Sequence, residues 1–296
     1  MTLLAEPLVV YGPRRTDALA SRSDALVALK QLVDPKAKKK PAMHAGDLAV
    51  ITSPGGHSAW ALDQMSLDGT PLTGLVVLSN TGDIWLVSAV ALAKTPPMKS
   101  VRMELKQSAI VPTGMTGGAK LDPAARAAAD KLTRGLAAQQ VWGDDLASRT
   151  DAVVIGPAAG DVTRGKADIK KMWKKRVKQN VREVAVGDVA AAATPDGQLA
   201  WASAPVVRFM DDEEPLPLRV FAVFEKDGAD WKMIALEEAL AVDEPGAGAQ
   251  LAKTPAPPLP KAADAPAPPP PADTTATPKK KKKKKKKPPP PSDDSG

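Results

Sequence analysis

The stretch TPDGQLAWASA (194–204) repeats a pattern that the chain has already used once, in SPGGHSAWALD (53–63). Both stretches contain a proline, a turn glycine and the sequence Ala-Trp-Ala at the same spacing. The wider segments 46–61 and 187–202 align without a gap and share eight identities in sixteen positions. Repetition over this length indicates a duplicated domain.

Further blocks support the duplication, because they recur in the same order in both halves of the chain. Downstream of the repeated turn, 71–85 aligns on 217–231 with five identities in fifteen positions. Upstream, a predicted strand and a predicted helix recur, the pairs being 7–13 with 152–157 and 22–33 with 165–177.

Each copy is predicted to contain a strand, a short amphipathic helix and then antiparallel strands joined by hairpins. Thr194-Pro-Asp-Gly197 lies between two apolar runs and has the composition of a type I turn closed by a glycine at positive φ. Ahead of the second copy, 121–149 is predicted to be helical, with Asp122 as N-cap and Pro123 at the first helical position. The first copy lacks such a helix, so we expect it to be N-terminally truncated or divergent.

These patterns predict an α+β fold with domains at 1–110 and 121–242, joined by a linker at 111–120. Proline, alanine and lysine dominate 243–296. A segment of that composition cannot bury enough apolar surface to offset the entropy lost on ordering, so we expect a disordered tail.

The basic charge of the chain is concentrated in this tail. The net charge is +7, and the tail holds 11 lysines against 6 acids, which leaves +2 for residues 1–242. A nucleic-acid-binding surface on the folded part is therefore not implied. The run of nine lysines could make weak, salt-sensitive contact with polyanions through residues such as Lys279, Lys283 and Lys287, or it could only keep the protein soluble.

The lack of cysteine and the scarcity of histidine exclude several kinds of catalytic and metal-binding site. The absence of cysteine excludes disulfides, thiolate catalysis and cysteine-ligated zinc. His44 and His57 have no identifiable third ligand, so we expect no metal and no cofactor. Apolar runs are too short to span a membrane and the first residues do not resemble a signal peptide, so we expect a cytoplasmic protein.

The second copy resembles a known family. The segments 153–157 (VVIGP), 160–173 (GDVTRGKADIKKMW), 186–209 and 216–236 together look like the SnoaL-like branch of the nuclear-transport-factor-two and ketosteroid-isomerase superfamily. The resemblance implies two cones in tandem, each a curved antiparallel sheet wrapped around helices with a pocket inside. Because family members often dimerise through the sheet, it also implies that the two copies pack sheet to sheet within one chain.

The pocket of the second cone has candidate residues on its predicted helices and strands. They are Trp142, Met172, Trp173, Trp201, Arg219, Phe221 and Glu225. By the two-residue period of a strand, Arg219, Phe221 and Glu225 share one face, where Arg219 could bind an anionic ligand. The structural alternatives are that the aromatic residues are core and that Arg219 pairs with an acid such as Glu225 on the outer face of the sheet.

Enzymatic members of the family commonly use an aspartate together with a tyrosine, a histidine or a second acid. Here the single tyrosine and both histidines belong to the first copy. This favours a non-catalytic role, either the binding of a small apolar or anionic ligand or protein interaction. Two alternatives stay open: a scaffold recruited to polyanions by the lysine tail, and a polyketide-cyclase or isomerase-type enzyme that uses Asp151, Arg219 or Glu225.

Overall fold

A computed structural model describes most of both copies. The described residues are 3–12, 18–32, 42–46, 48–97, 122–139, 142–211 and 215–240. The predicted linker and tail lie outside them, as do the lysines of the tail.

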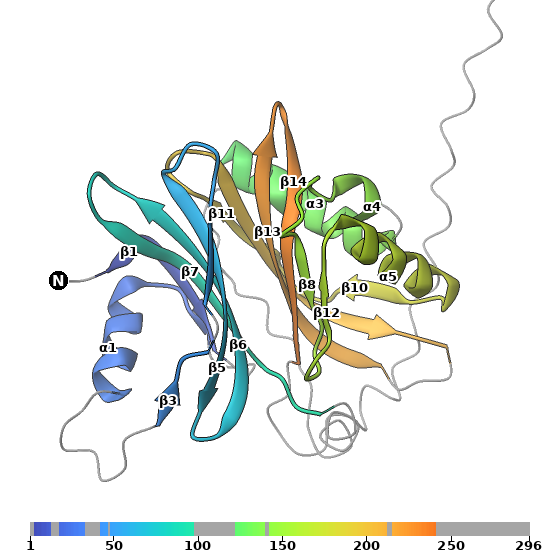
Figure 1. Ribbon diagram of the computed structural model, residues 1–296, viewed down its shortest axis with the longest axis horizontal. Helices are drawn as coiled ribbons and strands as arrows, with labels where there is room; N and C mark the ends of the chain where they lie inside the picture. The colour runs from blue at the N-terminus through green and yellow to red at the C-terminus, as the bar shows by residue number, and fades with distance from the viewer. Residues whose placement is uncertain are drawn as a thin grey trace, which may run out of the picture. The chain divides into compact units, whose positions relative to one another are not determined.

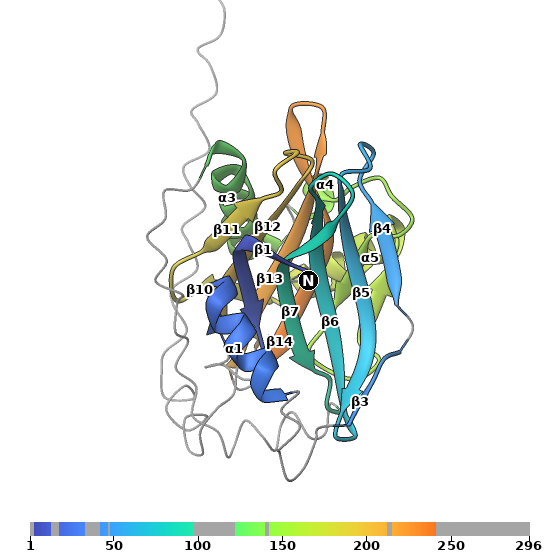
Figure 2. The ribbon, with the colours of Figure 1, turned by 90° about the vertical axis from the view of Figure 1, so that its left-hand side faces the viewer.

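The described residues of the first copy form one helix and seven strands. In chain order these are β1 (Leu4–Tyr11), β2 (Ala18–Leu19), α1 (Arg22–Leu32), β3 (Met43–His44), β4 (Ala49–Thr52), β5 (Ser58–Leu67), β6 (Thr70–Asn80) and β7 (Trp85–Lys94). The strands form one sheet in the order β2-β1-β7-β6-β5-β3, with β4 also paired to β5. Figure 2 shows α1 lying beside β1 at one side of this sheet.

The second copy adds two helices in front of the same plan. Its elements are α3 (Pro123–Ala137), α4 (Trp142–Asp145), β8 (Val153–Ile155), β9 (Val162–Arg164), α5 (Lys166–Lys178), β10 (Arg182–Ala185), β11 (Ala190–Ala193), β12 (Leu199–Phe209), β13 (Leu216–Asp227) and β14 (Asp230–Leu240). The sheet order is β9-β8-β14-β13-β12-β10, with β11 also paired to β12. This order matches the first sheet strand for strand.

Register confirms that the two sheets follow one plan. The repeated tryptophans occupy equivalent positions in the two sheets, because Trp60 pairs with Val77 and Trp201 pairs with Val223. Both sheets also have a bulge directly after that valine, on the pairing with the last strand. The α+β prediction is confirmed, with one addition: β1 pairs parallel to β7, and β8 pairs parallel to β14, so each sheet is mixed.

Local signals explain where the elements begin and turn. Asp122 caps α3 by accepting a hydrogen bond from the Ala125 amide at 2.6 Å, and Pro123 follows it, as predicted. In the repeated turn, Gly197 adopts a φ of +63° and its amide donates to the Thr194 carbonyl at 2.8 Å. The sequence therefore specifies these two boundaries directly.

The apolar core is divided by the faces of the second sheet. One cluster, here called the cone core, lies between the sheet and its helices and includes Leu132, Trp142, Trp173, Leu218, Val220 and Phe224. A second cluster, here called the sheet interface, joins residues of both sheets and includes Val9, Trp60, Val77, Trp201, Phe221 and Val223. Figure 1 shows α1 on the outer side of the first sheet and α3, α4 and α5 on the outer side of the second. Alternation along β13 thus sends successive side chains to different cores.

Candidate functional site

The apolar part of the cone core is filled by aromatic side chains. The rings of Trp142 and Trp173 stack with centroids 5.7 Å apart and an interplanar angle of 19°. Both side chains are fully buried. Gly135 on α3 lets Trp142 approach, because a Cβ at that position would collide with atoms of the indole ring. Trp142 and Trp173, both pocket candidates, lie together in the packed interior.

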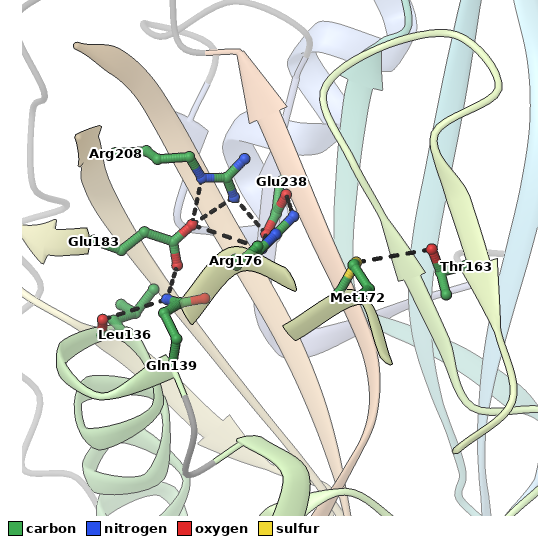
Figure 3. Close-up of polar contacts among 8 residues, drawn as sticks. All are labelled: Leu136, Gln139, Thr163, Met172, Arg176, Glu183, Arg208 and Glu238. Atoms are coloured by element: carbon green, nitrogen blue, oxygen red, sulfur yellow. Dashed lines mark hydrogen bonds and ion pairs between the residues drawn. The ribbon is translucent and has the colours of Figure 1, made fainter. Parts of the chain in front are cut away.

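A group of buried polar residues, here called the cone network, links α3 and α5 to strands of the second sheet (Figure 3). Its members are Gln139, Arg176, Glu183, Arg208 and Glu238. They come from five places in the second copy: the end of α3, helix α5, and strands β10, β12 and β14. Glu183, Arg208 and Glu238 are each at most 6% exposed.

Each charge of the cone network has an opposite charge within reach. The Arg176 guanidinium donates two hydrogen bonds to the Glu238 carboxylate, at 2.6 and 2.8 Å. Arg208 donates from Nε to Glu183 at 2.6 Å and forms an ion pair with Glu238, also at 2.6 Å. Gln139 donates to the second oxygen of Glu183 at 2.7 Å. The two positive and two negative groups therefore balance.

The electrostatics of the cone network keep Glu238 ionised. Burial alone would raise the pKa of Glu238, but the two guanidinium groups outweigh that effect and hold the pKa well below its usual range. Burial likewise opposes the charge of Arg208, while Glu183 and Glu238 hold the Arg208 pKa above its ordinary value. Groups held so firmly in one protonation state are poor proton carriers near neutral pH.

Asp161 differs from these acids. It lies at the edge of the cone network, in the turn before β9, and is half-buried. Burial and the negative charge of Glu238 raise the pKa of Asp161, whereas Arg176 and Arg208 act in the opposite direction. Gly156 makes room for it, since a Cβ there would collide with the Asp161 carboxylate. The pKa shifts of Asp161 and Glu238 therefore run in opposite directions.

Three other pocket candidates lie on the opposite face of the second sheet, in the sheet interface or at its edge. Trp201 stacks on Phe221, with ring centroids 5.6 Å apart and an interplanar angle of 19°. The Arg219 guanidinium donates to the carbonyls of Gly12 and Leu92 in the first copy, at 2.8 and 3.0 Å. The structure therefore does not bring these three residues together with Trp142 and Trp173.

Arg219 also stacks on Tyr11 of the first copy, with its Cζ 5.0 Å from the ring centroid. Burial raises the pKa of the Tyr11 phenol, against the lowering effects of a hydrogen bond with Ser203 and of the Arg219 charge. Arg219 thus connects the two copies through carbonyl oxygens and an aromatic ring.

Glu225 pairs with a residue that sequence reasoning did not consider. Arg149 donates to both Glu225 oxygens, at 2.8 and 3.0 Å, and also to both oxygens of Asp151, at 2.8 Å each. The hydrogen bonds from Arg149 hold the pKa of Asp151 below its usual range despite partial burial. The structure therefore gathers Asp151 and Glu225 on one arginine.

A further buried acid was also missed. Glu237 on β14 is 1% exposed, and neither of its carboxylate oxygens has a hydrogen-bond partner. Burial raises the pKa of Glu237 well above its usual range, although the Arg219 charge opposes the shift. Burial without a hydrogen-bond partner therefore disfavours the charged form of Glu237.

Two surface grooves lie on the second copy. The first, the α3 groove, has a volume of about 790 Å³ between α3 and the β13–β14 turn. Its lining includes Ala127, Lys131, Arg134, Lys226 and Trp231. Lys131 is buried and pairs with Asp145 at 2.6 Å and Asp230 at 3.0 Å.

The second groove, the α5 groove, has a volume of about 610 Å³ along α5 and β9. It is lined by Thr163, Asp168, Lys171, Met172, Lys174, Lys175 and Lys178. Met172, the remaining pocket candidate, lies here, where its sulfur accepts a hydrogen bond from the Thr163 hydroxyl at 3.7 Å (Figure 3).

Two other features, a metal-binding cluster and a membrane-spanning helix, are absent from the described residues. No group of three or more histidine, cysteine, aspartate or glutamate residues in this part of the chain could hold a metal ion. None of the described helices is long and apolar enough to cross a membrane.

The cone network left only a faint signal in the sequence. Arg208 interrupts the apolar run APVVRF (204–209), and Glu237 and Glu238 interrupt MIALEEAL (233–240). Charges inside strands that are otherwise apolar indicate buried polar partners. Which charges pair could not be deduced, because the members are up to 99 positions apart, from Gln139 to Glu238.

This fold, a sheet with helices packed on one face around a closed interior, agrees with what a comparison of family models found. Residues 137–240 match the family described as "SnoaL-like domain". The second copy is thus a SnoaL-like domain. No curated protein matches this chain.

Several solved structures are similar to one copy of the chain. An NTF2-like protein of unknown function from Pseudomonas putida KT2440 is 16% identical, with 38% of this chain and 82% of that one covered and a TM-score of 0.32. An NTF2-like protein with a cystatin-like fold from Novosphingobium aromaticivorans is also 16% identical, covering 43% and 86%, with a TM-score of 0.32. An NTF2-like superfamily protein from Salmonella enterica serovar Typhimurium is 14% identical, covering 39% and 89%, with a TM-score of 0.33.

Proposed function

We propose that this chain is a non-catalytic binding protein made of two SnoaL-like copies that pair through their sheets. The observation that carries the proposal is the closed interior of the second copy. Its apolar part holds the stacked Trp142 and Trp173, and its charged groups bind one another. A ligand entering this interior would have to break buried ion pairs, which is costly.

The paired sheets support a fixed internal dimer as the scaffold. Trp60 and Trp201, at equivalent positions, both belong to the sheet interface. Arg219 fastens the second copy to backbone carbonyls of the first. A buried interface of this kind holds the outer surfaces of the second copy in a constant geometry, as a binding site requires.

The surface best suited to a small ligand is the α3 groove. Its volume of about 790 Å³ is in the range of small-molecule sites. Trp231 offers an aromatic wall, and Lys226 lies over its ring at 5.9 Å. The bases Lys131, Arg134 and Lys226 outnumber the acids Asp130 and Asp230 in the lining of the groove. We therefore infer that its ligand is a small, largely apolar molecule that carries an anionic group.

Native mass spectrometry of the protein purified from its own host tests this proposal. We expect a stoichiometric small-molecule adduct on the wild type. The adduct should be lost in Ala127→Trp, which fills the α3 groove, and retained in Ala167→Trp, a matched change at an exposed site of α5. A bare polypeptide mass, or an adduct that survives Ala127→Trp, would overturn the assignment.

A second function, acid–base catalysis, is favoured by one observation, the raised pKa of the half-buried Asp161 beside two arginines. Any molecule released from the protein should be incubated with the wild type and with Asp161→Asn, and its mass followed. Turnover by the wild type that disappears in Asp161→Asn would replace the non-catalytic proposal with an enzymatic one. An unchanged molecule supports the binding function.

A further inference from the structure

Helix α5 has an unusual charge for an element that also packs on a core. Between Lys166 and Lys178 it holds seven basic residues and one acid. Arg176 is used inside the cone network, and Lys166 donates to Ser148 at 2.7 Å. The other lysines are left to the outer surface, where their repulsion needs a functional explanation.

Four of these lysines form a single stripe. Lys171, Lys174, Lys175 and Lys178 are exposed and follow the spacing i, i+3, i+4, i+7, which places them on one side of the helix. Within the described part of the chain, none of the four side chains makes an ion pair or a hydrogen bond. Neighbouring lysines in the stripe are therefore about 5–6 Å apart at Cβ and open to a partner.

The stripe borders a recessed floor that is less polar. The α5 groove is lined by the four lysines together with Met172 and Thr163, which contact each other. Methionine is flexible and polarisable, and it adapts to the apolar face of a bound helix. The site therefore combines positive edges with an adaptable apolar floor.

From these features we propose that the α5 groove docks an acidic amphipathic helix of a partner protein. Carboxylates spaced i, i+3, i+4, i+7 repeat at the same 5–6 Å as the lysines, so one acidic helix laid along α5 pairs with the whole stripe. Its apolar residues reach Met172. Asp168 lines the groove one turn before Lys171 and disfavours an acid there, which fixes the direction of the partner.

The same lining argues against two other polyanions. No aromatic side chain lines the α5 groove, whereas single-stranded nucleic acid is held mainly by base stacking on aromatic rings. It also lacks arginine, the residue suited to bidentate binding of phosphate. A lipid surface would need apolar side chains that project beyond the lysines, whereas Met172 is only partly exposed.

The test measures binding of a labelled synthetic peptide to the full-length protein by fluorescence anisotropy. The probe is a helix-forming peptide of about 14 residues, long enough to cover the stripe, with glutamates at the i, i+3, i+4, i+7 positions and leucines on the adjacent face. A peptide with glutamine in place of each glutamate is the negative control. A single-stranded oligonucleotide and anionic phosphatidylserine vesicles are measured alongside.

The decisive variant changes Lys171, Lys174, Lys175 and Lys178 to Gln. Its matched control neutralises Lys279, Lys281, Lys283 and Lys285 in the same way, so that the net charge falls equally in both. We expect the α5 variant to weaken peptide binding by about tenfold or more, and the tail control to change it by less than about twofold. Binding should also weaken between about 50 and 300 mM salt.

Met172→Gln separates docking from simple charge attraction. It should weaken binding of the leucine-bearing peptide about threefold or more, because the apolar floor becomes polar, and leave oligonucleotide binding unchanged. The proposal falls if the tail control loses as much affinity as the α5 variant. It also falls if oligonucleotide or vesicles bind the α5 groove more tightly than the peptide, or if Met172→Gln has no effect.

Discussion

In the second copy, α5 buries Ile169 and Trp173 against the sheet, whereas in the first copy α1 buries Ala25 alone among its described side chains. Val27 and Leu29 of α1 remain 56% and 45% exposed. Yet the two sheets behind these helices have the same strand order, a tryptophan paired with a valine at the same position, and a bulge directly after that valine. A sheet plan can thus persist while its helical covering changes.

The same comparison locates the charges. Glu238 pairs across the sheet with Val220, and the equivalent pair in the first copy is Leu92 with Gly74. Glu237 corresponds in the same way to Ala91. Glu237 pairs with Ile155 on β8, and Ala91 pairs with Tyr11 at the equivalent position of β1. The buried acids are therefore present in the second copy and replaced by Leu92 and Ala91 in the first, and removing them tests what they contribute.

The largest effect is expected for Arg208→Met. The substitution keeps an unbranched stem but removes the guanidinium, which leaves Glu183 and Glu238 in the interior with only the Arg176 guanidinium between them. Breaking a buried ion pair from one side costs about 3–5 kcal/mol of unfolding free energy, which urea denaturation monitored by tryptophan fluorescence will measure.

Two further variants make the result for Arg208 specific. Arg164→Met removes an exposed arginine of the same copy and should change stability by less than about 0.5 kcal/mol. Adding Glu183→Gln to Arg208→Met should recover part of the loss, because one uncompensated charge disappears. If Arg208→Met is as stable as the wild type, the cone network does not hold the second copy together.

A smaller, pH-dependent effect is expected for Glu237→Gln. Because burial raises the pKa of Glu237 in the folded state, the folded protein keeps a proton that the unfolded chain releases above about pH 4.5. Wild-type stability should therefore fall as pH rises from that value towards the raised pKa, by up to about 1.4 kcal/mol per pH unit.

Glutamine cannot lose a proton, so the variant should be more stable than the wild type at pH 8 and about equal to it below pH 4.5. Asp161 also has a raised pKa, so Asp161→Asn serves as the comparison that separates the two contributions to the slope. Parallel stability curves for wild type and Glu237→Gln between pH 5 and 8 would show that Glu237 does not titrate in this range.

Sequence patterns predicted the hairpin-connected antiparallel strands of both copies, because these follow from the repeat and from short-range turn signals. They did not predict the parallel pairing of β1 with β7 or of β8 with β14. The turn at Thr194–Gly197 and the cap at Asp122 depend on residues a few positions apart, and both were predicted correctly. Which side chains share a face of the sheet was also predicted, since Arg219 and Phe221 do lie on the same face. What alternation along one strand cannot specify is which face meets the helices.

The cone network was not predicted, for a physical reason. Its stability depends on five side chains from separate elements meeting at hydrogen-bond distance, and no local pattern encodes such a meeting. Glu225 shows the same limit: its partner, Arg149, is 76 positions away. A net charge near zero for the folded part is compatible with many different pairings of acidic and basic side chains. Which ion pairs form is determined by the fold.

The smallest effect is expected for Gly135→Ala, and its sign tests how tightly the helices added to the second copy are packed. Alanine in place of glycine inside a helix normally stabilises it by about 1 kcal/mol. At Gly135 the new methyl group would occupy the position of the Trp142 ring, and this must displace the stack on Trp173. Overpacking of this kind costs about 1–3 kcal/mol, so a net loss of about 1 kcal/mol should result.

Gly143→Ala is the matched control, since it lies in α4 and its added Cβ would meet only the Lys170 side chain, at an ordinary 3.8 Å. That variant should be unchanged or slightly more stable, because it gains helix propensity without a collision. Near-ultraviolet circular dichroism should change for Gly135→Ala alone, because in that variant the indole rings of Trp142 and Trp173 move apart. If both variants stabilise equally, the interior of the second copy has room to spare, and a ligand could enter where we place a closed core.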